Sequence, residues 1–109
     1  MTEDEMTVDY QISENVLEAI VRGALEGEKR ARIRAGGALG RSRGVDVDVD
    51  EQSCRVSVHL DGQLGEDLVE VGMLAQERIS RSLSRMTGLA VATVDVTFDG
   101  VFPVSHNDQ

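Results

Sequence analysis

Three aspartates recur at every second position of one segment, and carboxylates are the side chains that bind hard cations. Asp46, Asp48 and Asp50 alternate with valines and could bind a hard cation weakly, with Asp95 or Asp99 across the sheet as a further ligand. An extended strand spaces alternate side chains about 6–7 Å apart, and no glycine-bearing loop wraps these carboxylates into a cage. We therefore interpret the aspartates as a solvated strand face and expect no bound metal.

A basic segment at residues 29–43 contrasts with a chain whose net charge is −9. Its cations are the candidate contacts for a partner or an anion: Lys29, Arg30, Arg32, Arg34, Arg41 and Arg43. A basic segment on an acidic body forms an electric dipole, which can steer head-to-tail self-association or dock the segment on an anionic partner. A solvated loop without a partner is the open alternative.

The same segment contains Gly37-Ala38-Leu39-Gly40, a Gly-x-x-Gly spacing like that of the loop with which KH domains clamp a nucleic-acid backbone. In KH domains that loop joins two helices, whereas here it precedes a strand. Aromatic residues make up 3% of the chain, so platforms for stacking bases are scarce. Nucleic acid is not the expected partner, and an RNA-binding module built on residues 29–43 is kept as the alternative function.

No nucleophile, acid and base converge in the sequence. Cys54 has the inward parity of its strand and His59 the outward parity, whereas a cysteine nucleophile needs a base beside the thiol. Neither His59 nor His106 has another ligand at metal spacing. A single cysteine and the lack of a signal peptide favour a reducing cytoplasm. We expect no enzymatic activity and no cofactor.

The elements that position these residues follow from hydrophobic periodicity. Helical spacing predicts helices over residues 14–28, capped by Ser13, and 66–87, ended by Gly88. Period-two alternation predicts strands over residues 45–50, 54–61 and 92–99. The stripe expected to face inward on the long helix comprises Leu68, Val69, Gly72, Met73, Gln76, Ile79, Leu83 and Met86.

The order helix, strand, strand, helix, strand predicts an α+β fold of two layers. Each element has one apolar face, so two helices should cover one face of a three-stranded mixed sheet. The crossover through the long helix should make the second and third strands parallel. We expect one domain over residues 8–102, with a mobile acidic tail at 1–7 and a mobile tail at 103–109. The unpaired sheet edges invite strand addition.

Several segments together resemble a known family. They are residues 10–17, the valine-rich hairpin at 44–60, the helix end Met86-Thr87-Gly88-Leu89, and the strand that contains Val94-Asp95-Val96. Over residues 8–101 the chain resembles the alkaline shock protein 23 family of bacterial cell-envelope stress-response proteins. The Arg- and Gly-rich residues 29–43 depart from the usual pattern, which puts the partner surface in doubt and leaves the fold unaffected.

This resemblance implies a non-enzymatic, self-associating cytoplasmic protein that supports cell-wall homeostasis. Such a protein acts as a scaffold and binds a membrane-anchored partner, which places it at the inner face of the membrane. No apolar run approaches the roughly 20 residues of a membrane-spanning helix, so we expect no direct insertion. The family defines no catalytic residues, and none is assigned here.

Overall fold

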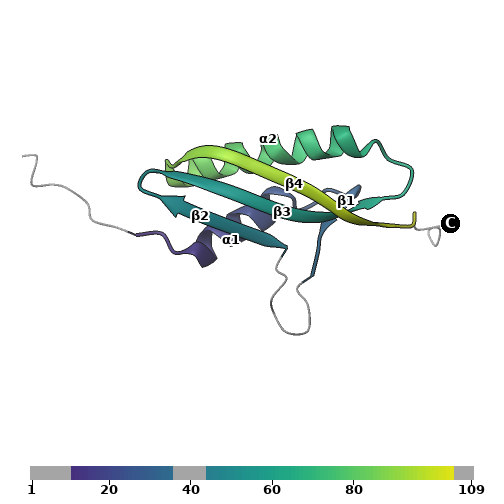
Figure 1. The fold of residues 1–109 in the computed structure, drawn as a ribbon, viewed down its shortest axis with the longest axis horizontal. Helices are drawn as coiled ribbons and strands as arrows, with labels where there is room; N and C mark the ends of the chain where they lie inside the picture. Colours follow the sequence, from purple (N-terminus) through teal and green to yellow (C-terminus); the bar gives the residue numbers. More distant parts are fainter. Residues whose placement is uncertain (1–10, 36–43, 105–109) are drawn as a thin grey trace, which may run out of the picture.

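The computed structural model describes residues 11–35 and 44–104. Over these ranges the chain is an α+β fold, as expected, with two helices and a four-stranded sheet (Figure 1). The expected tail at 1–7 and residues 105–109 of the C-terminal tail lie outside the described residues. The elements are α1 (Glu14–Ala24), β1 (Ala31–Ile33), β2 (Val45–Asp50), β3 (Ser53–Gln63), α2 (Leu68–Thr87) and β4 (Ala90–Phe102).

Strand β3 is the centre of the sheet. On one side it pairs antiparallel with β2, from Val45 opposite Val58 to Asp50 opposite Ser53, and then with β1 opposite residues 60–62. On its other side it pairs with β4, and these two strands are parallel, as a crossover through α2 requires. β1 and β2 therefore follow one another along one edge of β3, and β4 occupies the opposite edge.

The expectation of three strands was wrong, because β1 lies in the segment interpreted as a basic loop. Ala31 and Ile33 alternate with arginines and turn toward the core, where Ala31 is buried. The amide of Arg34 extends the pairing by donating to the carbonyl of His59 at 2.9 Å. The period-two signal was present but short, and the surrounding charges and glycines obscured it.

Both helices pack on one face of the sheet (Figure 1). The inward parity predicted for β3 is confirmed, since Cys54, Val56, Val58 and Leu60 are all buried. From the helices, the fully buried side chains are Leu17, Val21, Val71, Ile79 and Leu83. Burying an aliphatic side chain contributes about 1.5–3 kcal/mol relative to exposure, so this aliphatic layer is the main source of stability.

The helix ends follow the capping rules, although the first helix is shorter than expected. The Ser13 hydroxyl accepts from the amide of Val16 at 3.4 Å, and α1 ends at Ala24 rather than near residue 28. The carboxylate of Asp67 accepts from two amides of the first turn of α2. Gly88 ends α2 with φ of 77°, the left-handed conformation for which a glycine was predicted there.

The inward face predicted for α2 was partly wrong. Val69, Met73 and Met86 are 73%, 63% and 68% exposed. The residues that face the core are Val71, Gly72, Ala75, Ile79 and Leu83. The first half of α2 has apolar side chains around most of its circumference, so the spacing alone allowed more than one face to be turned inward. One consequence is an exposed apolar strip on α2.

Candidate interaction surfaces

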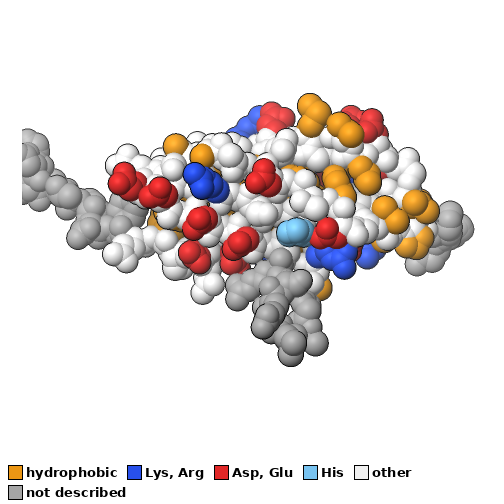
Figure 2. Space-filling model, in the orientation of Figure 1, with side chains coloured by type: hydrophobic (Ala, Val, Ile, Leu, Met, Phe, Trp, Pro, Cys, Tyr) orange, Lys and Arg blue, Asp and Glu red, His pale blue; other side chains and the backbone are white. Residues whose placement is uncertain are grey.

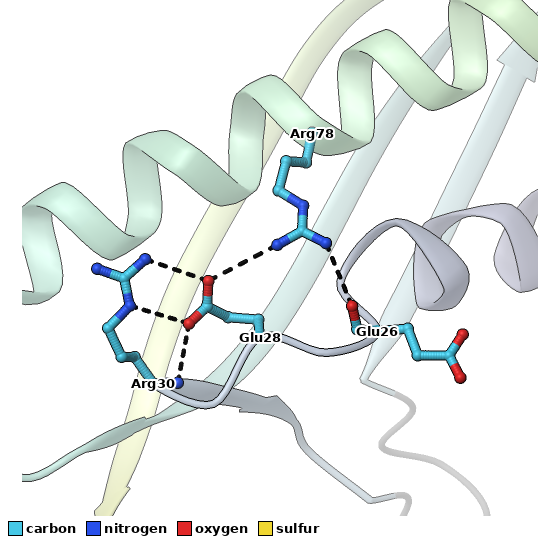
Figure 3. Close-up of polar contacts among 4 residues, drawn as sticks. All are labelled: Glu26, Glu28, Arg30 and Arg78. Atoms are coloured by element: carbon cyan, nitrogen blue, oxygen red, sulfur yellow. Dashed lines mark hydrogen bonds and ion pairs between the residues drawn. The ribbon is translucent and has the colours of Figure 1, made fainter.

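Among the candidate cations, Arg30 has partners within the chain, and its side chain is 31% exposed. Its side chain donates to both oxygens of the Glu28 carboxylate at 2.9 and 3.2 Å, and its backbone amide donates to the same group at 2.9 Å. From α2, Arg78 reaches this carboxylate at 3.7 Å and donates to the carbonyl of Glu26 at 3.2 Å (Figure 3). The hydrogen bond from the Arg30 side chain lowers the pKa of Glu28 below its ordinary value, and the charge of Arg78 adds to this.

The other described cations of the basic segment divide into one exposed lysine and two arginines with partners in the chain. Arg32 lies over the ring of Phe102, 3.8 Å from its centroid, and Arg34 pairs with Asp61 at 2.9 Å. Lys29 is exposed. Arg41, Arg43 and the Gly-x-x-Gly sequence at 37–40 lie outside the described residues. Contact of this segment with a partner or an anion therefore stays a prediction.

The sheet face away from the helices is mainly acidic, with its carboxylates spread over β2, β3 and β4 (Figure 2). On this face Asp48 lies opposite Arg55, and Ser57 lies between Asp46 and Asp95 in the register of the three strands. Within the described ranges, no three His, Cys, Asp or Glu side chains are close enough to hold a metal ion. Asp46, Asp48 and Asp50 are exposed, as expected of a solvated strand face.

The two groups with catalytic side-chain chemistry lie on opposite faces of β3. Cys54 is 1% exposed, and burial raises the pKa of its thiol, which disfavours the reactive thiolate. On the open face, His59 Nδ1 lies 2.7 Å from the Asp99 carboxylate. The sequence did not predict this pair, because it depends on the register of β4 with β3, in which an irregularity leaves Asp99 without a directly opposite residue.

An apolar groove runs between α2 and β4. Its lining residues are Leu68, Val69, Gly72, Met73, Gln76, Val96 and Phe98. A second groove continues along the same two elements through residues 91–94 and shares Met73 and Gln76 with the first. Figure 2 shows hydrophobic side chains gathered over the first half of α2 and the neighbouring part of β4. This surface was not predicted from the sequence, because the spacing of Val69 and Met73 placed them in the core.

The groove borders an open strand edge. Among the described residues, β4 pairs with β3 alone, so its outer edge has no partner strand. The Gln76 side chain reaches this edge from α2 and donates to the carbonyl of Val94 at 2.9 Å. An unpaired strand beside an exposed apolar helix strip is a geometry suited to association with another polypeptide.

Comparison with known proteins gives one family match. A family model for the alkaline shock protein 23 family, described by a cell envelope-related function, matches residues 28–103, more than two thirds of the chain. No curated protein and no solved structure matches the chain significantly. In the described part of the chain, no helix is long and apolar enough to cross a membrane.

Proposed function

Because this chain belongs to the alkaline shock protein 23 family, whose described function relates to the cell envelope, we propose that it is a non-enzymatic envelope scaffold. In this role it associates with itself and binds a membrane-anchored partner from the cytoplasmic side. The family match carries the proposal, and it agrees with the resemblance of the helix end at 86–89 and the strand that follows it.

The surface properties support association in preference to catalysis. The groove between α2 and β4 presents Val69 and Met73 to solvent beside an unpaired strand. Contiguous exposed apolar residues on a small domain are typical of interaction sites. The thiol of Cys54, in contrast, is buried and faces away from His59. The most reactive side-chain types therefore lie in the core or on the open acidic face.

Cell fractionation with cross-linking tests this function. We expect the chain, cross-linked in intact cells of its native host, to be recovered in the membrane fraction linked to an integral membrane protein. Without cross-linking, an alkaline carbonate wash should release it, because a peripheral protein is held by a partner rather than by lipid. Recovery in the soluble fraction alone, with no membrane protein attached, would contradict the proposal.

A further inference from the structure

We propose that the outer edge of β4 pairs with the same edge of a second copy, antiparallel and centred on Val96. This inference rests on the proposed function, since it names the surface and partner through which the chain associates with itself. In the dimer, the two sheets become one continuous sheet, and the two copies of α2 lie side by side on its helical face.

The backbone at the centre of β4 turns polar groups toward this outer edge, and pairing requires Gln76 to release the Val94 carbonyl, to which it donates at 2.9 Å. His59 bonds Arg34 and Gly44 through its backbone, so its polar groups face β1 and β2. Its neighbours in β3, residues 58 and 60, therefore face β4. In a parallel ladder, the residues directly opposite them turn their own groups away. Val96 lies opposite Val58 and Phe98 lies opposite Leu60, so the backbone N–H and C=O groups of Val96 and Phe98 face the outer edge of β4. The same holds for Val94, two residues earlier in the strand.

The acidic side chains of β4 select the register. When Val96 lies opposite Val96 of the second copy, Asp95 faces Thr97 and Asp99 faces Thr93, so no two carboxylates are directly opposed. Sliding the copies by two residues, the smallest shift that keeps the outward groups aligned, places Asp95 opposite Asp95 or Asp99 of the other copy. Like charges directly opposite each other destabilise a pair. The alternation of Thr and Asp in residues 93–99 is therefore self-complementary in the register centred on Val96.

The helical side of the pairing buries the exposed strip of α2. A Cβ at Gly72 would lie 3.4 Å from the ring of Phe98 and 3.9 Å from Val96, so this turn of α2 sits over the centre of the pairing. Val69 and Met73 flank Gly72 on the helix. Because α2 packs on β4, the two copies of α2 meet across the two-fold axis, and they must move apart from the about 4.8 Å spacing of neighbouring strands to the about 8–10 Å of packed helices. The second copy thus covers apolar side chains that a single copy leaves in water.

Sedimentation velocity of the full chain over a range of concentrations tests the pairing with charge variants of the strand. Thr97→Asp faces Asp95 of the other copy and should weaken dimerisation roughly 2- to 30-fold, because the pair occurs twice. Thr97→Lys should strengthen it to a similar degree. The double variant Asp95→Thr/Thr97→Asp restores the Thr–Asp pairs at the wild-type net charge and should recover most of the wild-type affinity. Ser57→Asp and Ser57→Lys, on the same face but on the central strand, are the matched controls.

A second pair of variants tests the helical side. Met73→Glu places carboxylates near the two-fold axis and should weaken dimerisation at least tenfold. Met86→Glu changes a similarly exposed methionine about 20 Å further along α2 and should leave the dimer unchanged. Thermal unfolding of each variant separates lost pairing from lost folding.

The salt dependence separates this dimer from head-to-tail association. Two acidic copies repel each other, so β4 pairing should strengthen or stay constant as salt rises. The proposed pairing would be overturned if the dimers dissociate as salt rises, or if Thr97→Asp and Met73→Glu leave the dimerisation affinity unchanged. Either result would still be compatible with self-association through another surface. A strict monomer at all concentrations would overturn the pairing, and recovery with a membrane protein would still support the rest of the proposed function.

Discussion

Arg78 of α2 lies 3.7 Å from the carboxylate of Glu28, which joins the long helix to the connection between α1 and β1. The Glu28 side chain is 10% exposed and accepts three hydrogen bonds from Arg30, so it is a paired carboxylate largely withdrawn from water (Figure 3). Breaking hydrogen bonds to a charged group of this kind costs about 1–3 kcal/mol. The contact fixes where β1 starts relative to α2.

Glu28→Gln should therefore lower the free energy of unfolding by about 1–3 kcal/mol at neutral pH. The folded-state pKa of Glu28 is below its ordinary value of 4.5. Its contribution is thus complete above the unfolded pKa and is lost as pH falls through the lower folded pKa. The difference in the free energy of unfolding between wild type and Glu28→Gln, measured by urea unfolding, should become smaller below about pH 4.5.

Glu26→Gln is the matched control, because Glu26 contributes its backbone carbonyl to Arg78 and its side chain points away from the cluster (Figure 3). It should leave stability within about 0.5 kcal/mol of wild type. Equal effects of the two substitutions, or a Glu28 effect that does not depend on pH, would show that the ion cluster does not stabilise the fold.

The orientation of α2 gives a second prediction. Ile79→Ala removes a fully buried side chain and should cost about 2–5 kcal/mol. Met73→Ala, at a position 63% exposed, should change the free energy of unfolding by less than about 0.5 kcal/mol in dilute protein. Chemical denaturation measures both. A large loss for Met73→Ala in the monomer would contradict the observed orientation and restore the inward stripe expected from the sequence.

Much of the fold could be predicted from the sequence where one pattern had one interpretation. The alternation in residues 45–61 correctly placed Cys54 and the valines inward, except for Val49, which is 39% exposed, and the caps at Ser13 and Gly88 placed two helix ends. Strand β1 was missed because three residues carry little periodicity. The exposed strip on α2 was missed because helical spacing shows that a face is apolar without showing what covers it.

The candidate site was predictable only in part, for a related reason. The cations of residues 29–43 were visible in the sequence, but two of their partners, Asp61 and Phe102, depend on the register of β1 and β4 with β3. Predicting the groove would have required knowing how α2 is rotated about its axis, that is, which of its apolar side chains face the core. Both properties are set by packing between segments distant in sequence, which local patterns do not encode.

The buried thiol gives a third prediction. Cys54 should not react with a thiol reagent such as Ellman's reagent at mildly alkaline pH until the chain is unfolded, because burial limits access and raises the thiol pKa. Ser57→Cys, combined with Cys54→Ala, places a thiol on the open face of the same strand and should react rapidly. Similar native rates for the two thiols would show that Cys54 is accessible and would reopen a catalytic role.

The RNA-binding alternative gives a fourth prediction. Arg30 and Arg34 are already paired with carboxylates, and the sheet face is acidic. We therefore expect no retardation of labelled single-stranded RNA in near-physiological salt. Tight binding that weakens steeply as salt rises would support a nucleic-acid role for residues 29–43 and contradict the envelope scaffold as the main function.

Complementation of a native-host strain that lacks the protein tests the central claim most directly. That claim is that the chain serves the cell envelope through the surface formed by α2 and β4. Under envelope stress, wild type and Met86→Glu should restore growth. Met73→Glu, present at the same level and equally folded, should not. Full rescue by Met73→Glu would contradict the account, because the groove would then be dispensable for the function in the cell.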